Sequence, residues 1–140
     1  MVLYSRDIMR KNFPIVGGDI SAADAARIMV SESSGFLIVN GTEGHYGIVT
    51  EWDILSKITA RNLDPASVAV KDVMTRDFIS VSPDTPTVKL VEIMKEKKIR
   101  RLPVVERGKV IGVITSRNIL AIFSEYVDNV AEVASKYGNY

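Results

Sequence analysis

The feature that most constrains this chain is an internal repeat. Shifting the sequence by 65 residues, which places Asp7 on Asp72, aligns the two halves without a gap. Identical pairs then recur along the alignment: Met9/Met74, Phe13/Phe78, Val16/Val81, Leu37/Leu102, Gly47/Gly112, Thr50/Thr115, Ile54/Ile119 and Leu55/Leu120. Two copies are too few for a solenoid. The sequence therefore predicts two similar units packed with pseudo-twofold symmetry.

Each copy has the pattern β-α-β-β-α, which predicts an α/β (α+β) fold. Strand candidates are residues 13–16, 36–39 and 46–50 in the first copy, and 78–81, 102–105 and 110–115 in the second. Glycine-containing hairpin signals occupy 40–44 and 106–109. Ser21 is an expected helix N-cap, Thr85 with Pro86 should begin the matching helix, and a second helix should follow Thr50 and Thr115.

These elements give the expected boundaries of the chain. Repeat 1 covers 1–61, a linker covers 62–71 and repeat 2 covers 72–126. Residues 127–140 form a C-terminal tail that continues the last helix, with Gly138 as its expected end. The apolar face of this helix favours self-association.

Composition excludes several classes of protein. The net charge of +1 argues against a strongly electrostatic nucleic-acid binder, and the absence of cysteine excludes disulfides and thiolate metal sites. No stretch approaches the roughly 20 apolar residues that span a bilayer, and the N-terminus does not resemble a signal peptide. We therefore expect a cytoplasmic protein without a membrane partner.

One motif carries ligand-binding chemistry. The third strand of each copy ends in Gly, two apolar residues and Thr, followed at the third position by Asp53 or Asn118 and then Ile-Leu. A strand that ends at a helix N-terminus presents free backbone N–H groups and the positive end of the helix dipole. There a Thr hydroxyl can bind a phosphate or ribose oxygen, and a carboxylate can accept the hydroxyls of a ribose.

The same residues fit a structural role. Thr50 and Asp53 also have the spacing of a capping box, in which Thr is the N-cap and the acidic residue lies at N3. Asn118 is a weaker partner in either role, so it does not separate the two interpretations. Both stay open at this point.

In combination, the motifs resemble a tandem pair of CBS domains over roughly residues 4–123. The resemblance rests on the duplicated Gly-h-h-Thr-x-x-Asp-h-h element (h, apolar), the Asp-h-Met segments at 7–9 and 72–74, and Arg101-Leu102-Pro103-Val104-Val105. It implies two repeats packed through their sheets, with clefts that bind AMP, ADP or ATP and sometimes S-adenosylmethionine. It also implies a homodimer that regulates an effector protein, and no enzymatic activity or cofactor.

The resemblance assigns roles to individual residues. Asp53 and Thr50 match the ribose-binding pair, Arg100, Arg101 and Arg117 match basic side chains near the phosphates, and Phe13, Pro14, Ile15 and Val16 match the strand that lines the adenine pocket. The second copy, with Thr115, Asn118, Ile79 and Val81, should form a weaker site. An amide there loses the charge-assisted hydrogen bond that a carboxylate makes, which is about twice as strong, and Gly35-Phe36 replaces the two arginines.

The leading hypothesis is thus an adenine-nucleotide sensor, and the alternative is a structural or dimerisation module without a ligand. A third hypothesis, nucleic-acid binding through the basic run from Lys95 to Arg101, is weakened by Glu92 and Glu96. The sequence contains no Ser-His-Asp set, P-loop or GxGxxG motif, so no catalytic residue is predicted. His45 is the only histidine, so no metal site is predicted either.

Overall fold

The computed structural model describes residues 2–41 and 44–137, which form two compact units. The first-repeat unit comprises Asn12–Ile79 with Arg107–Val110. The second-repeat unit comprises Met1–Lys11, Ser80–Glu106 and Ile111–Tyr140. The predicted α/β class is confirmed, and the β-α-β-β-α order is complete in the first copy.

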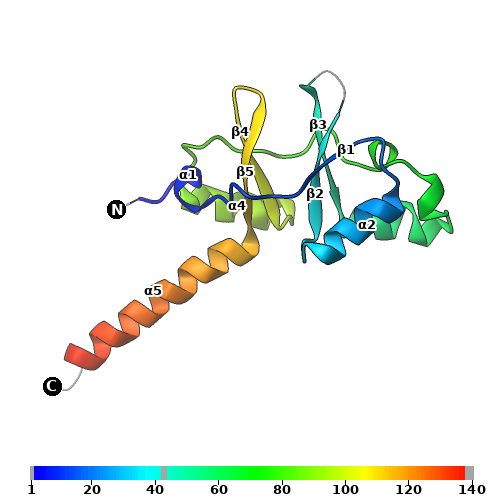
Figure 1. Ribbon diagram of the computed structural model, residues 1–140. Helices are drawn as coiled ribbons and strands as arrows, with labels where there is room; N and C mark the ends of the chain where they lie inside the picture. The colour runs from blue at the N-terminus through cyan, green and yellow to red at the C-terminus, as the bar shows by residue number, and fades with distance from the viewer. Residues whose placement is uncertain (1, 42–43, 138–140) are drawn as a thin grey trace. The chain divides into compact units, whose positions relative to one another are not determined.

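The first-repeat unit is built on a three-stranded sheet with the order β1-β2-β3 (Figure 1). Strand β1 (Ile15–Gly17) runs parallel to β2 (Phe36–Asn40), which is antiparallel to β3 (Tyr46–Thr50). Helix α2 (Ala22–Ser31) connects β1 to β2, and helix α3 (Glu51–Lys57) follows β3 directly. The short 3-10 turns η2 (Thr59–Arg61), η3 (Pro65–Ser67) and η4 (Val70–Asp72) follow α3 in the chain.

The core of the first-repeat unit explains this arrangement. Strand β2 lies between two other strands and is buried on both faces, so Phe36, Leu37, Ile38 and Val39 form a continuous apolar run. Helix α2 contributes a single apolar face instead. Its buried residues Ala22, Ala25 and Met29 recur every three or four positions, as one face of a helix requires.

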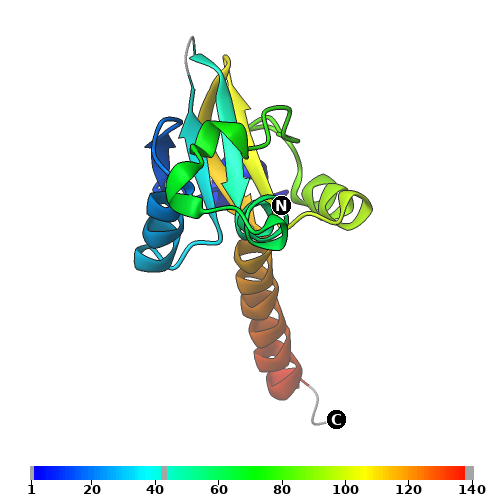
Figure 2. The same cartoon turned by 90° about the vertical axis from the view of Figure 1, so that its right-hand side faces the viewer.

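The second-repeat unit contains the hairpin of β4 (Arg101–Glu106) and β5 (Lys109–Thr115). Helix α1 (Ser5–Ile8) and helix α4 (Thr87–Lys97) belong to the same unit. Helix α5 (Ser116–Tyr137) continues from β5 and extends away from the hairpin (Figure 2). The core combines Val81, Leu90, Met94, Leu102, Val104 and Ile114 with the partly buried Ile8 and Met9.

Each unit contains the leading segment of the other repeat. In the first-repeat unit, Ile48 and Thr75 exchange two backbone hydrogen bonds of 2.9 and 2.8 Å. In the second-repeat unit, the equivalent Val113 and Arg10 exchange two of 3.0 Å. Segment 4–10 therefore packs on the body of repeat 2, and segment 69–75 packs on the body of repeat 1. The compact units consequently cross the boundaries that the repeat alignment suggests.

A pair of matching contacts fixes these segments. A Cβ atom on Gly47 would clash with the Met74 sulfur, and one on Gly112 would lie 2.6 Å from the Met9 sulfur. The two glycines therefore leave the space that each methionine fills, which explains why Gly and Met repeat together. The sequence predicted these methionines as core residues but not that each contacts the other repeat's strand.

Strand candidate 78–81 is not formed as a strand, and only an isolated parallel bridge joins Val81 to Val104. The cause is Pro103. In the first copy the equivalent Ile38 donates its N–H to the Pro14 carbonyl at 3.0 Å, whereas proline has no N–H to donate. The parallel ladder is therefore shorter in the second copy.

The predicted helix starts are partly correct. Ser21 caps α2 by accepting a hydrogen bond of 3.0 Å from the Asp24 N–H, as expected. The expectation for Thr85 was wrong, because α4 begins at Thr87 and Pro86 is its N-cap with no side-chain bond. Helix α5 reaches Tyr137 as expected, whereas Gly138 and part of the 40–44 hairpin lie outside the described residues.

Candidate functional site

Thr50 and Asp53 form a complete capping box where β3 ends and α3 begins. The Asp53 Oδ2 accepts hydrogen bonds from the Thr50 N–H at 2.9 Å and from the Thr50 hydroxyl at 3.1 Å. In return the Thr50 Oγ1 accepts from the Asp53 N–H at 3.3 Å. The capping interpretation of this motif is therefore confirmed, and the question becomes whether the carboxylate can also serve a ligand.

Lys57 holds the second oxygen of the same carboxylate. Its Nζ lies 2.8 Å from the Asp53 Oδ1 and also donates to the Val73 carbonyl at 2.8 Å. The Asp53 side chain is only 7% exposed, whereas that of Lys57 is 36% exposed. Asp53 is also the one buried carboxylate among residues 2–41 and 44–137. Lys57 therefore joins this buried charge to the leading segment of repeat 2.

Lys57 was not predicted as a site residue from the sequence, although two signals pointed to it. Lys57 follows Asp53 by four residues, the spacing that brings two side chains together on one helix face. In the second copy both charges are absent, because Asn118 and Ile122 replace Asp53 and Lys57. The joint replacement of both partners indicates that the two residues act as a pair.

The second copy keeps the capping geometry without the charge. The Asn118 Oδ1 accepts from the Thr115 N–H and the Thr115 hydroxyl, each at 2.9 Å. The Thr115 Oγ1 accepts from the Asn118 N–H at 3.2 Å. The amide oxygen therefore replaces the carboxylate oxygen Oδ2 as a cap, and an amide NH2 group, which is neutral and only donates hydrogen bonds, replaces the charged oxygen Oδ1.

The strand predicted to line the adenine pocket begins at the end of the sheet where Thr50 lies. Phe36, the first residue of β2, pairs with Thr50, and Ile15 pairs with Ile38 two residues further along β2. Because β1 is parallel to β2, the start of β1 and the end of β3 flank the same end of the sheet. Phe13, Pro14 and Val16 are half-buried and Ile15 is half-exposed there.

The structure places the three arginines in the other unit. The Arg100 carbonyl accepts from the Ser116 N–H at 2.9 Å, Arg101 opens β4, and the exposed Arg117 lies in the first turn of α5. These residues therefore gather beside Thr115 and Asn118, at the end of the β4–β5 hairpin. Their expected phosphate contacts stay a prediction, as do the roles of Ile79 and Val81 in a second site.

Other kinds of site find no support in the described part of the chain. Within it, no group of three or more His, Asp or Glu side chains could hold a metal ion. Nor is any of its helices both long and apolar enough to cross a membrane.

Comparison with known proteins explains the repeated motif. The model of the CBS domain family matches residues 6–60 and again 70–125. An uncharacterized protein of Methanocaldococcus jannaschii, MJ0450, is 32% identical over 131 residues, which are 91% of this chain and 70% of that protein. A homoserine O-acetyltransferase of Methanohalobium evestigatum is also 32% identical, over 88% of this chain but only 24% of the enzyme.

Two solved structures share the fold. The CBS domain pair of protein MJ0100, in complex with 5′-methylthioadenosine and S-adenosyl-L-methionine, is 28% identical with a TM-score of 0.79, covering 90% of this chain and 99% of that one. A hexameric CBS-CP12 protein from bloom-forming cyanobacteria is 28% identical with a TM-score of 0.78, covering 100% of this chain and 87% of its own. With two family matches and the matching fold, this chain belongs to the CBS domain family as a tandem pair.

Proposed function

We propose that this chain is a regulatory module of the cytoplasm that binds an adenine nucleotide (AMP, ADP or ATP) at Thr50 and Asp53. The observation that carries the proposal is the buried carboxylate of Asp53 at the end of β3, beside the N-terminus of α3. A buried carboxylate accepts strong hydrogen bonds from hydroxyl groups, and two vicinal hydroxyls are what a ribose offers.

The bonds already made by Asp53 leave room for such a ligand. A carboxylate has about four acceptor positions, and Thr50 and Lys57 use three of them. One ribose hydroxyl can take the fourth. A second hydroxyl requires Lys57 to leave Oδ1, and Lys57 is exposed enough to turn into water.

Displacement of Lys57 also provides a route for signalling. When a ligand takes Oδ1, the hydrogen bond from Lys57 to the Val73 carbonyl weakens, because the lysine moves with the loss of its partner. Val73 belongs to the leading segment of repeat 2. Ligand binding then favours one packing of this segment over another, by the difference in affinity between the two states.

The comparisons support the class of ligand. The two ligands of the MJ0100 domain pair both contain adenosine, so a CBS pair of this fold binds the adenosine moiety. S-adenosylmethionine is therefore the second ligand to test on this chain. The match covers only 24% of the homoserine O-acetyltransferase, which supports a regulatory module instead of a catalyst. We propose that this module acts on an effector protein.

We further propose that the chain assembles with copies of itself. The alignment with the hexameric CBS-CP12 protein covers the whole of this chain, including helix α5. A homodimer is the smallest such assembly and is the form that the sequence resemblance predicts.

A structural role without a ligand is the second candidate. It is favoured by the completeness of the capping box and the ion pair, which satisfy Asp53 without any ligand. Under this alternative, changes at Asp53 should alter stability alone.

Calorimetric titration with AMP, ADP, ATP, S-adenosylmethionine, 5′-methylthioadenosine and GTP tests the proposal. The variant is Asp53→Asn, which keeps the cap as Asn118 does, and the matched control is the exposed carboxylate change Asp24→Asn. We expect one adenine compound to bind the wild type and Asp24→Asn with the same dissociation constant. For Asp53→Asn the dissociation constant should be about tenfold higher or more. Absence of binding by every compound would overturn the proposal and favour the structural role. Binding that Asp53→Asn leaves unchanged would exclude this site.

The predicted phosphate contacts need their own variants. If these side chains bind phosphates, Arg101→Gln and Arg117→Gln should weaken the binding of ATP more than the binding of adenosine. Only ATP carries the negative charge that the arginines would neutralise. An equal effect on both ligands would refute the phosphate role.

A further inference from the structure

Helix α5 carries an apolar face that the described part of the chain leaves uncovered. Every residue from Phe123 to Tyr137 is exposed. Seven large apolar side chains lie along this helix at 45–69% exposure: Leu120, Phe123, Tyr126, Val127, Val130, Val133 and Tyr137. A helix that contacts so little of its own unit gains little stability from tertiary packing, which is where most helices in proteins obtain it.

The spacing of these residues is that of a coiled coil. Leu120, Phe123, Val127, Val130, Ala134 and Tyr137 follow one another at alternating intervals of three and four, so they occupy successive a and d positions of a heptad. We call this row the α5 seam. A seam of this period is the contact surface of supercoiled helices, whereas a helix that covers a globular core usually shows a 3.6-residue period.

Charged residues avoid the α5 seam. From Ile119 to Tyr137 the charged side chains are Glu125, Asp128, Glu132 and Lys136, and all four occupy the b, c or f positions of the heptad. The e and g positions, which border the seam, hold small or apolar residues such as Ser124, Tyr126, Ala131 and Val133. The surface is therefore suited to a partner that is itself apolar and uncharged along its length.

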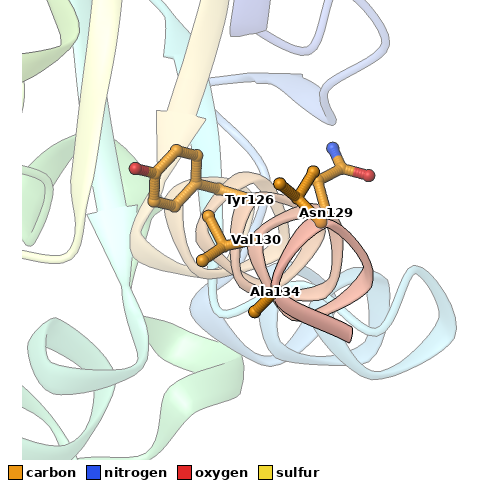
Figure 3. Close-up of a pocket in the computed structure, with 5 residues that line it drawn as sticks. Tyr126, Asn129, Val130 and Ala134 are labelled. Carbon is orange, nitrogen blue, oxygen red and sulfur yellow. The ribbon is translucent and has the colours of Figure 1, made fainter. Parts of the chain in front are cut away.

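A shallow groove runs along the g side of the α5 seam. Tyr126, Asn129, Val130, Val133 and Ala134 line it. Val130 and Ala134 belong to the seam itself, and Tyr126 and Val133 are the g residues that border it. Figure 3 shows Tyr126 and Val130 on one side of α5, with Asn129 pointing away from them.

The exposed area fits a stable interface. At roughly 150–200 Å² for a large side chain, the seven residues expose on the order of 700 Å² of apolar surface. This exceeds the roughly 300–600 Å² of the largest patch on a typical monomer. It approaches the roughly 800 Å² that each partner contributes to a standard protein interface.

We propose that the α5 seam pairs with the same helix of a second copy, parallel and in register. The sizes of the flanking residues favour this partner and orientation. In a parallel pair each g residue faces the e residue five positions further along the other chain, which places the large Tyr126 against the small Ala131 of the second copy. An antiparallel pair would place g against g, and so bring the bulky Tyr126 and Val133 together. This inference rests on the proposed self-association and assigns the surface that produces it.

Analytical ultracentrifugation of the full chain tests the surface. Val130→Asp places a charge in the seam, and Ser135→Asp places the same charge at an exposed b position that lies outside both the seam and the groove. We expect Val130→Asp to raise the dissociation constant about tenfold or more, because an unpaired carboxylate is strongly disfavoured in an apolar interface. Ser135→Asp should leave it unchanged. A monomeric wild type, or an assembly that Val130→Asp leaves intact, would overturn the proposal.

Cysteine crosslinking tests the orientation, and the chain has no native cysteine to interfere. In a parallel pair two Val130→Cys residues face each other across the seam and should form a disulfide under mild oxidation, while Ser135→Cys should stay monomeric on a non-reducing gel. Dissociation by Val130→Asp without crosslinking at position 130 would refute the parallel register. Nucleotide titration of Val130→Asp separates this result from the ligand site, since each property can fail without the other.

Discussion

The pairing of Asp53 with Lys57 can be tested by copying the second repeat into the first. The double change Asp53→Asn with Lys57→Ile installs the residues of Asn118 and Ile122. The single changes separate the two duties of Asp53, because asparagine keeps the acceptor for Thr50 and loses the ion pair. Alanine at position 53 loses both.

The expected magnitudes follow from the contacts. Asp53→Asn should lower the free energy of unfolding by about 1 kcal/mol, since Lys57 is over a third exposed and solvent screens the pair. Asp53→Ala should lower it by about 2–4 kcal/mol, because the cap is worth about 1 kcal/mol and the partly buried Thr50 donors also lose their acceptor. For a chain of this size 1 kcal/mol corresponds to roughly 3–5 °C in melting temperature.

The double variant measures the coupling. We expect it to be less destabilised than the sum of its two single variants by about 0.5–2 kcal/mol, because removing both charges leaves neither without a partner. Urea unfolding followed by circular dichroism, at one fixed protein concentration, gives the free energy of unfolding of the wild type and of each variant. An Asp53→Asn variant as unstable as Asp53→Ala would refute the capping argument. Strictly additive single variants would show that the two residues are not coupled.

Three further results follow from the structure. Gly47→Ala should lower stability by about 1–3 kcal/mol, since its Cβ clashes with Met74, and Met74→Ala in the same chain should recover part of that loss in urea unfolding. The hydrogen bond from Lys71, and secondly its positive charge, lower the pKa of Asp19 in the folded state. The pair therefore stabilises the fold at pH values above the unfolded-state pKa of Asp19. This stabilisation is lost as the pH falls through the folded-state pKa of Asp19. The stability difference between wild type and Asp19→Asn should therefore vanish in acid, and a difference that persists there would contradict the assignment. Ligand binding should speed hydrogen exchange at the Thr75 amide, because the hydrogen bond from Lys57 to the Val73 carbonyl helps to keep the segment with Thr75 in place. Lys57→Met should abolish this effect of the ligand.

The sequence by itself determined the order of elements and the motif, because both depend on local chemistry. A 65-residue repeat, the alternation of apolar runs with turn residues, and Thr50 three residues before Asp53 are all visible along the chain. The capping box could be predicted for the same reason, since it joins residues within one helical turn. Pro103 could have predicted the missing strand pairing in repeat 2, because the loss of an N–H is a property of the residue itself.

Only the tertiary structure decided which segments pack together. The leading segments 4–10 and 69–75 each pack on the body of the other repeat, and both arrangements bury the same pattern of residues. Because the repeats are alike, the sequence cannot distinguish packing within a copy from exchange between copies. The bond from Lys57 to the Val73 carbonyl depends on that exchange. The link from the buried carboxylate to the second repeat is therefore set by long-range packing.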